Sequence, residues 1–384
     1  MRLLRSERFP ALMLLSAAVV GLVVANSAAG EAALSLRAAP IGIPGVFTLS
    51  VGHVIADLLL AVFFFVVAVE LQFELTRGQL NTPRKALQPA IAATGGVVVP
   101  IIVFVLFARG TEAASGWPIP TATDIAFALG VLAVFGRGLP SGLRIFLLAL
   151  AILDDIVGIV FIAVLFTTDI DFGMIVAAVV SLAVFGVLSR MLDSRTRLPI
   201  AVAMFVVAVA TWYFVYQAGI HATIAGVALG LVMVQTPALR VRHVLEPWVN
   251  ALVLPLFAFS SALVVIPAVS PRELSPAFWG VVVALPVGKI IGITVAGWIS
   301  QRVGRRDGDA PLPLGDLLAA GALGGIGFTV SLLLAELAFA GDAGTRDQAT
   351  LGVLVGSTIS LVLAGVLVSW RSWHYRRNPI PATT

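Results

Sequence analysis

The sequence predicts an all-helical polytopic membrane protein that forms a single domain over residues 1–384. Two observations lead to this fold class. The chain is 59% hydrophobic and only 11% charged, and apolar runs close to 20 residues long recur along it. About 20 apolar residues suffice for one helix to cross a bilayer. A soluble domain carries about 25% charged residues, so the composition excludes that class.

Twelve apolar runs mark the expected membrane spans. Their limits are 9–29, 53–75, 87–108, 118–135, 142–167, 173–190, 198–217, 219–235, 246–267, 276–300, 315–340 and 348–370. The first run follows Arg2, Arg5 and Arg8, so it also fits a signal peptide. We keep it as a membrane helix, with the signal peptide as the alternative.

The basic residues orient these spans. With both termini in the cytoplasm, 19 of the 24 Lys and Arg residues lie in cytoplasmic segments and four in outer loops. Cytoplasmic loops are enriched in these residues, so the bias supports twelve spans with both chain ends inside. The formal charge of +4 comes from these short clusters between apolar runs, and no nucleic-acid partner is expected.

The fourth and eleventh spans are expected to be broken. The fourth opens with prolines and with Thr123 and Asp124, and the eleventh carries Gly324, Gly325 and Gly327, which weaken the helical hydrogen-bond ladder. Each is the middle member of a triple, spans 3–5 and spans 10–12, and the triples have opposite orientation. This pattern predicts inverted repeats whose two discontinuous helices cross near an ion site at the midplane. The alternative is that the glycines only permit close helix packing.

Two adjacent acids, Asp154 and Asp155, lie in the middle of the fifth span. An ionised aspartate at a helix centre costs roughly 2.5 to 3.5 kcal/mol on insertion scales, so the pair indicates a site. Lys289 in the tenth span is equally costly and is expected to pair with a carboxylate. Neighbouring helix residues point about 100° apart, so one acid is expected to bind an ion while the other holds the lysine.

Oxygen ligands without sulfur suit a hard cation such as sodium, lithium, a proton or calcium. A carboxylate that takes either a metal ion or a proton makes the two compete, which is the mechanism of an antiporter. If release of the cation takes up more than one proton, each cycle moves net charge, worth about 2.3 kcal/mol per charge per 100 mV. We therefore expect a transporter and not an enzyme, with no cofactor besides the transported cation and H+.

Several short motifs occur in order along the chain: Ala25-Asn26-Ser27, Thr123-Asp124-Ile125-Ala126-Phe127, Leu153-Asp154-Asp155, Gly219-Ile220-His221-Ala222-Thr223, Gly288-Lys289 and Gly325-Ile326-Gly327-Phe328-Thr329. Together they make nearly the whole chain resemble the NhaA family of sodium/proton antiporters. That family is itself a known example of inverted repeats with broken helices. The resemblance implies export of Na+ or Li+ in exchange for H+, a plasma-membrane location and, commonly, a homodimer.

The resemblance also implies roles for individual residues. Asp155 would be the main cation ligand and proton carrier, and Asp154 would assist it or pair with Lys289. Thr123 and Asp124 would lie where the broken helices cross, with Asp124 compensating the helix dipoles. The positions that correspond to the cytoplasmic entrance and the pH response are Glu70, Glu74 and His243.

The entrance departs from the family pattern. Gln72 and Phe73 stand where basic residues are usual, and Glu246 stands where a second histidine is known. The pH at which the protein becomes active therefore stays open.

Two peripheral segments have simpler interpretations. Residues 38–49 are expected to form an outward-facing hairpin suited to contact a second copy of the chain. Trp370, Trp373 and Tyr375 beside Arg371 are typical of the belt that contacts lipid at the membrane surface.

Other functions stay open at this stage. A sodium-coupled solute symporter, or another cation/proton carrier, would use the same buried acids, whereas Lys289 argues against an open cation channel because it would repel the ion. An intramembrane aspartyl protease would pair Asp124 with Asp155 as general acid and base. Its Gly-x-Gly-Asp element is missing, and the nearest stretch is Pro313-Leu314-Gly315-Asp316.

Overall fold

The computed structural model describes residues 8–43, 47–167, 169–192, 197–303 and 311–378. Five arginines that contribute to the predicted orientation lie outside these residues: Arg2, Arg5, Arg195, Arg305 and Arg306. Short 3-10 and π-helical turns, labelled η, interrupt or extend several of the helices.

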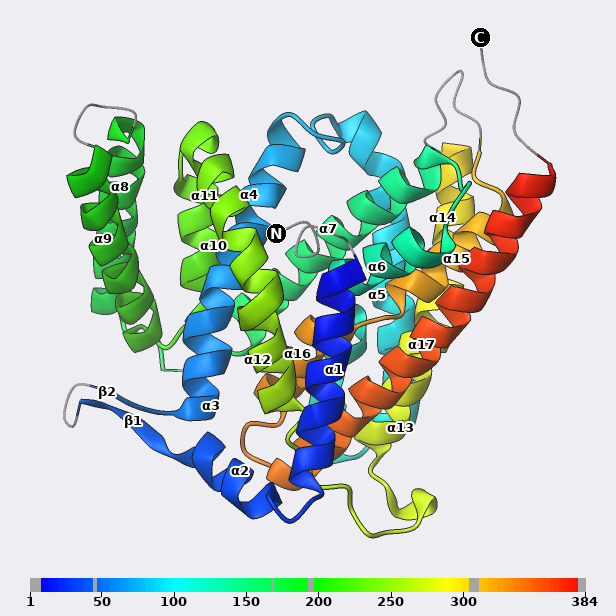
Figure 1. Ribbon diagram of the computed structural model, residues 1–384, viewed down its shortest axis with the longest axis horizontal. Coiled ribbons are helices and arrows are strands. Elements are labelled where there is room, and N and C mark those ends of the chain that lie inside the picture. Colours follow the sequence, from blue (N-terminus) through cyan, green and yellow to red (C-terminus); the bar gives the residue numbers. More distant parts are fainter. Residues whose placement is uncertain (1–7, 44–46, 168, 193–196, 304–310, 379–384) are drawn as a thin grey trace.

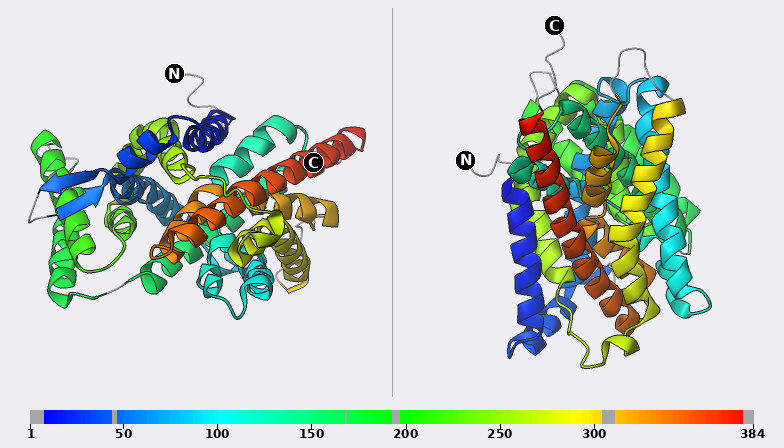
Figure 2. Two further views of the ribbon diagram at one scale, coloured as in Figure 1. Left: turned by 90° about the horizontal axis from the view of Figure 1, so that it is seen from below. Right: turned by 90° about the vertical axis from the view of Figure 1, so that its right-hand side faces the viewer.

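The first part of the chain contains α1 (Arg8–Ala25), α2 (Gly30–Ala38), β1 (Pro40–Ile43), β2 (Phe47–Ser50), α3 (Val51–His53), η2 (Val54–Leu59), α4 (Leu60–Thr76), α5 (Pro83–Ala108), η3 (Glu112–Gly116), η4 (Ile119–Thr121), α6 (Ile125–Phe135) and α7 (Ser141–Leu165). The second part contains α8 (Phe172–Met191), α9 (Arg197–Gln217), α10 (Thr223–Val232), α11 (Gln235–Trp248), η5 (Val249–Val253), α12 (Leu254–Ser261), η6 (Pro271–Glu273), α13 (Pro276–Val283), η7 (Ala284–Gly288), α14 (Lys289–Val303), α15 (Leu314–Gly324), α16 (Phe328–Ala338) and α17 (Ala343–Arg377). Figure 1 and Figure 2 show the long helices running roughly along one direction, with α2 lying across it.

Eight helical segments of the described chain are long and apolar enough to cross a membrane, and the number rises to 11 if each bent helix pair is one span. The bent pairs are α1 with α2 at 110°, residues 112–121 with α6 at 46°, and α15 with α16 at 48°. The protein is therefore a multi-pass membrane protein. The breaks in the fourth and eleventh predicted spans fall on two of these pairs, whereas the bend after α1 was not predicted.

The predicted eighth span is shorter than its apolar run. The run covers residues 219–235, but α10 has only ten residues, about 15 Å of helix, because the chain turns at Gly219 with a φ of +77°. The predicted ninth span differs in the other direction. Its helical segment begins at Gln235 and ends at Ser261, because the polar residues before the apolar run are also helical.

Side-chain caps fix several helix starts. The Asp171 carboxylate accepts hydrogen bonds from the backbone N–H groups of Gly173 and Met174, at 2.7 and 3.1 Å, and so begins α8. Proline at the first helical position begins α5 and α13, where its missing N–H needs no partner.

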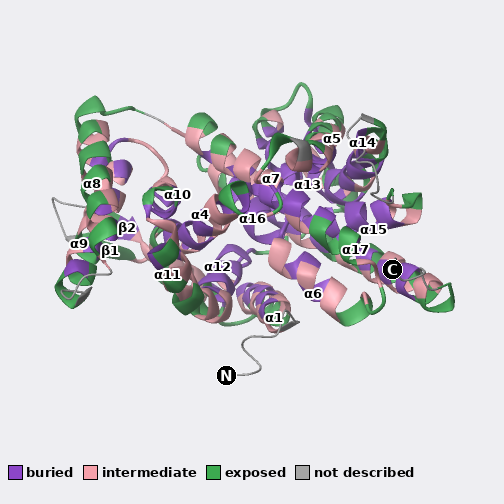
Figure 3. Ribbon diagram, turned by 90° about the horizontal axis from the view of Figure 1, so that it is seen from above, coloured by how far each residue is buried: buried purple, intermediate pink, exposed green. Residues whose placement is uncertain are grey.

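Small residues set the closest helix contacts. A side chain at Gly292 of α14 would collide with the backbone of Gly95 in α5, so the two glycines let these helices approach. Close packing of this kind is what holds helices together where lipid is as apolar as the protein interior. Figure 3 shows the buried residues gathered around α7, α13, α15 and α16, with exposed faces on the outer helices such as α8.

The predicted hairpin is present. β1 and β2 pair antiparallel, with Pro40 opposite Ser50 and Ile41 opposite Leu49. It projects from the end of the molecule where α2 and α3 lie (Figure 1). This small sheet is the exception to an otherwise helical fold in the described residues.

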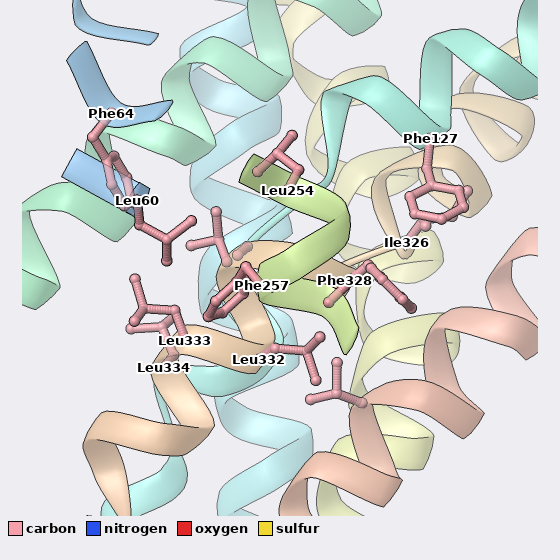
Figure 4. Packing of buried hydrophobic residues seen from close by; sticks show 14 of the residues in the cluster. Leu60, Phe64, Phe127, Leu254, Phe257, Ile326, Phe328, Leu332, Leu333 and Leu334 are labelled. Carbon is pink, nitrogen blue, oxygen red and sulfur yellow. The ribbon is translucent and has the colours of Figure 1, made fainter. Parts of the chain in front are cut away.

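The broken spans rest on an apolar core. Phe257 and Leu254 of α12 lie against Phe328, Leu332 and Leu333 of α16 (Figure 4). All five side chains are at most 3% exposed. This packing holds the start of α16, and with it the second break, at a defined place in the bundle.

Candidate functional site

The two acids of α7 face different surroundings. Asp154 is 1% exposed, and its Oδ2 atom accepts a hydrogen bond from Lys289 Nζ at 2.7 Å. Asp155 is 8% exposed and lines a cavity. The divergence follows from the rotation of about 100° between neighbouring helix residues.

Lys289 is fully buried at the start of α14, and its ammonium group has three acceptors. It donates to Asp154 Oδ2, to the Thr123 hydroxyl at 3.1 Å and to the backbone carbonyl of Thr121. An ammonium group has three hydrogens, so all of them are used. The predicted pairing of the lysine with a carboxylate is present, and its partner is Asp154.

Thr123 connects this ion pair to the second broken span. Its hydroxyl lies 2.7 Å from Asp154 Oδ2 and 2.8 Å from the carbonyl oxygen of Gly324, and it donates to one of them at a time. The other carboxylate oxygen, Asp154 Oδ1, is buried and has no hydrogen-bond partner among the described residues. That oxygen is therefore a buried acceptor that no described residue satisfies.

Asp124 caps two helices at once. Its Oδ1 atom accepts from the backbone N–H of Phe127 at 3.1 Å, which begins α6. Its Oδ2 atom accepts from the Thr329 hydroxyl at 2.8 Å and from the Thr329 backbone N–H at 3.3 Å, in the first turn of α16. Both helix N-termini carry partial positive charge, which the carboxylate offsets.

The two breaks are joined directly by backbone contact. The N–H of Asp124 donates to the carbonyl of Ile326 at 2.6 Å. Unwound backbone inside a membrane has to find partners within the protein, and here each break supplies them for the other.

The predicted glycines lie at the second break. They are needed there because the neighbouring segments leave no room for a side chain, and not because the backbone conformation requires glycine. Gly325 and Gly327 have φ of −73° and −84°, right-handed conformations that any residue adopts. A side chain at Gly325 would lie 2.7 Å from the carbonyl oxygen of Leu285 and from the hydroxyl of Ser360. Together with Gly324, these glycines let η7, α14 and α17 close around the break, which was the alternative interpretation of the cluster.

A cavity of about 460 Å³ leads to Asp155. Its polar lining includes Thr123, Asp124, Asp155, Thr329, Glu70, Arg242, His243 and Glu246, between walls built from residues such as Phe63 and Leu148. No hydrogen bond or ion pair joins the Asp155 carboxylate to another described residue. Of the two acids at this centre that line the cavity, Asp155 is therefore the one whose carboxylate has no partner among the described residues.

The other end of the cavity carries alternating charges. Arg242 forms an ion pair with Glu70, with both side chains about one-quarter exposed, and lies 3.9 Å from the half-exposed Glu246. His243 stands beside them on α11. Two of the three predicted entrance residues, Glu70 and His243, thus line the same cavity, together with Arg242 and Glu246.

Glu74, the third predicted entrance residue, lies outside the cavity lining. It is 6% exposed, and its Oε2 atom accepts a hydrogen bond from the backbone N–H of Gln79 at 2.6 Å, in the turn between α4 and α5. It is not among the described residues that line the cavity. The predicted entrance role of Glu74 has no support from this geometry.

Sequence reasoning assigned no role to Arg242 or Thr329. Arg242 lies in a basic stretch before an apolar run, where it counts only as an orientation signal. Thr329 belongs to a motif that was recognised, but its hydroxyl partner, Asp124, lies 205 positions away in the sequence. A spacing pattern along the chain gives no signal for such a contact.

The chain is similar to known proteins over nearly its whole length. Residues 1–368 match the family described as Na+/H+ antiporter 1. The Na(+)/H(+) antiporter NhaA 2 of Clavibacter michiganensis subsp. michiganensis is 53% identical over 380 residues, which cover 98% of this chain and 93% of that protein. The Na(+)/H(+) antiporter NhaA of Tropheryma whipplei is 44% identical over 373 residues, covering 96% and 95%. That of Thermobifida fusca is 40% identical over 392 residues, covering 98% and 95%. Matches of this extent show that the chain belongs to the Na+/H+ antiporter 1 family.

Proposed function

We propose that this protein is a transporter, not an enzyme, that exports Na+ or Li+ across the plasma membrane in exchange for H+, with Asp155 as the shared site. One observation carries the proposal: at the end of the cavity, Asp155 has no partner among the described residues, while the neighbouring Asp154 is held by Lys289. A carboxylate with no fixed partner can bind a cation or a proton, but not both.

Competition at Asp155 then drives the exchange. Ionised Asp155 attracts a cation through the cavity, and the orphan oxygen of Asp154 supplies a second ligand. Protonation of Asp155 removes the charge that holds the cation and releases it. If the cation also weakens the hold of Asp154 on Lys289, the lysine gives up a second proton, and the exchange moves net charge. The transported ions take the place of any bound cofactor.

For the architecture, we propose twelve spans in one domain, with α10 as the short eighth span and both termini in the cytoplasm. Spans 3–5 and 10–12 would form inverted repeats whose broken members cross at Asp124. The similar bends of 46° and 48°, the hydrogen bonds between the breaks and the distribution of Lys and Arg support this arrangement.

The cavity would then open toward the cytoplasm and take up Na+ there. Glu70, Arg242 and His243 are charged or can become charged, so the potential at the entrance depends on pH. We propose that this group, without Glu74, regulates access. The hairpin of β1 and β2 would contact a second copy of the chain, and the exposed apolar faces of the outer helices would contact lipid.

Two alternatives make different predictions. A sodium-coupled symporter would use the same acids but would require a solute for any proton or sodium movement. An aspartyl protease would need two carboxylates that share a proton, but both oxygens of Asp124 accept bonds from Phe127 and Thr329.

The test is proton movement in everted membrane vesicles acidified by respiration. Addition of Na+ or Li+, but not K+, is expected to alkalinise the lumen, and Asp155→Asn is expected to reduce the response to background because an amide cannot ionise. Asp171→Asn is the matched control, since Asp171 is an exposed carboxylate that caps α8 and asparagine caps equally well. Full exchange by Asp155→Asn would contradict the site, and a response that needs an added solute would favour a symporter.

A further inference from the structure

The last two turns of α17 form an ion pair with α15. Residues that only contact lipid at the membrane surface would not be expected to form such a pair. Arg371 is 6% exposed, and its Nε atom donates to Asp316 Oδ1 at 2.6 Å. Asp316 is fully buried in the first turn of α15. The expected lipid belt fits Trp370 and Trp373, which are 48% and 46% exposed, but not this arginine.

Tyr375 completes the cluster around the same carboxylate. Its hydroxyl donates to Asp316 Oδ2 at 2.6 Å, and the Arg371 guanidinium lies 4.9 Å from the centre of its ring. Gly315 leaves the room for this arrangement, because a side chain there would come within 2.9 Å of Arg371 Cδ. Both oxygens of Asp316 are thus held by α17, which fixes the position of α15 as well as its charge.

The same turns of α17 also hold the other broken span. The Ser372 hydroxyl donates to the backbone carbonyl of Arg137, in the turn that follows α6. Gly138 in this turn has a φ of +89° and lies against the Arg376 side chain. α17 packs along both α6 and α15 (Figure 1). The C-terminal end of α17 thus holds the two half-helices at the ends that lie away from the breaks.

The inner ends of these half-helices form the candidate site. α15 has 11 residues, a rod of about 16 Å, and it ends at Gly324, whose carbonyl lies 2.8 Å from the Thr123 hydroxyl. α6 starts at Ile125, with Asp124 as its N-cap. A short helix moves as a rigid rod, so a displacement at the end held by α17 also displaces the end at the break.

We propose that Asp316, Arg371, Ser372 and Tyr375 form a brace, a set of positioning residues that keeps α6 and α15 in register so that the two breaks stay aligned beside Asp155. This role rests on the proposed antiport at Asp155. The brace contacts neither the cation nor the proton. Its effect is on the affinity of the site, because ion ligands displaced by a fraction of an ångström bind less well.

The main variant is the double substitution Asp316→Leu with Arg371→Met. Removing one partner would leave an unpaired buried charge and a protein that fails to fold, whereas an apolar pair of similar volume keeps the packing and removes the directional bonds. We expect the KM for Na+ to rise by about tenfold with the maximal rate nearly unchanged. Tyr375→Phe, which removes one hydroxyl, should give a smaller rise in the same direction.

The control is a polar contact between helices outside both triples. Ser181 of α8 and Thr211 of α9 lie 2.9 Å apart, and Thr211 is 1% exposed. Ser181→Ala with Thr211→Val should lower thermal stability while leaving the KM for Na+ at the wild-type value. If the brace affected only stability, both double variants would lower the thermal stability and leave the KM for Na+ at the wild-type value.

The measurement combines Na+-dependent proton flux in proteoliposomes with the increase in unfolding temperature on adding Na+, which reports affinity without transport. A raised KM together with a weaker Na+ stabilisation in the brace variant alone supports the proposal. An unchanged KM in that variant, or an equal rise in the control, would overturn it. Wild-type protein that shows no Na+-dependent flux and no stabilisation would overturn the antiport function, and the brace with it.

Discussion

Two ion pairs of similar chemistry lie in different surroundings. Lys289 and Asp154 meet at 2.7 Å with both side chains fully buried at the breaks. Arg242 and Glu70 meet at the cavity entrance, with side chains that are 25% and 24% exposed. The first pair is surrounded by protein, and the second is reached by water and salt.

This difference in exposure gives the two ion pairs different roles. The buried pair belongs to the fold, and the exposed pair can respond to conditions. Removing one member of a buried pair leaves an uncompensated charge, so the pair at the breaks is part of what the fold requires. A pair reached by water contributes about 0 to 1 kcal/mol and is screened by salt, so the entrance pair can change with conditions without disturbing the fold. Asp155 belongs to neither pair, and in the proposed function it is the group that binds the transported ion.

The largest effect on stability is expected at the buried pair. Lys289→Ala should lower the free energy of unfolding by about 3 to 5 kcal/mol, because Asp154 loses the cation that holds it. Thermal unfolding of the purified protein in detergent measures this loss. Lys289→Leu with Asp154→Asn removes both charges and should recover part of it. A Lys289→Ala variant that unfolds at the wild-type temperature would show that the buried pair is no more important than the exposed one.

A smaller effect, of a different kind, is expected at the entrance. Arg242→Gln should change the free energy of unfolding by at most about 1 kcal/mol. It should lower the KM for Na+, because it removes a positive charge from the cavity lining and leaves Glu70 unpaired. The difference should fade between 0.1 and 1 M ionic strength, as the screening length falls from about 10 to about 3 Å.

The control for the entrance is Arg272→Gln, which removes an exposed charge in η6, away from the cavity. It should leave both the KM and its salt dependence unchanged. An effect of Arg242→Gln that persists at high salt would mean that the entrance pair acts through structure, which would remove the distinction between the two pairs.

The smallest effect is expected at a fully exposed carboxylate. Asp342 begins α17, and hydrogen bonds from Thr345 and Gly344 hold the pKa of its carboxyl below the usual value. A lowered pKa means that this cap stabilises the fold above the usual aspartate pKa, about 3.9, and that the contribution is lost as the pH falls through the lowered value. Asp342→Ala should therefore lower the unfolding temperature slightly at neutral pH.

The difference in unfolding temperature between Asp342→Ala and the wild type should shrink on acidification. Asp342→Asn should unfold at the wild-type temperature at neutral pH, because asparagine also caps helices. Unfolding curves at several pH values measure both. A loss at Asp342 as large as that at Lys289 would contradict the ordering by burial.

The centre of the site could be predicted because each charge there violates the composition of a membrane helix. Asp154, Asp155 and Lys289 were recognised for that reason, and a lysine with no water nearby had to pair with an acid. The apolar pattern alone did not decide which acid, and only the family resemblance pointed to Asp154. That choice depends on how α7 is rotated relative to α14, and hydropathy along the chain carries no information about rotation.

Other features were missed because one residue pattern serves two purposes. Arg371 and Tyr375 near a chain end look like a lipid belt, and only the position of Asp316 on another helix distinguishes them. The eighth apolar run is continuous in hydropathy, so its length did not reveal that α10 stops after ten residues. The entrance role of Glu74 stays a prediction, because its carboxylate accepts a hydrogen bond from the backbone of a nearby turn and does not line the cavity.

The double cap at Asp124 also limits the order in which the chain can assemble. Its carboxylate begins α6, and it receives hydrogen bonds from Thr329, which lies 205 residues later. At synthesis rates of about 5 to 20 residues per second, roughly 10 to 40 s separate the emergence of these two residues from the ribosome. During that interval lipid cannot satisfy the polar groups at the first break. The first broken span therefore lacks these buried hydrogen-bond partners until the second one has been synthesised.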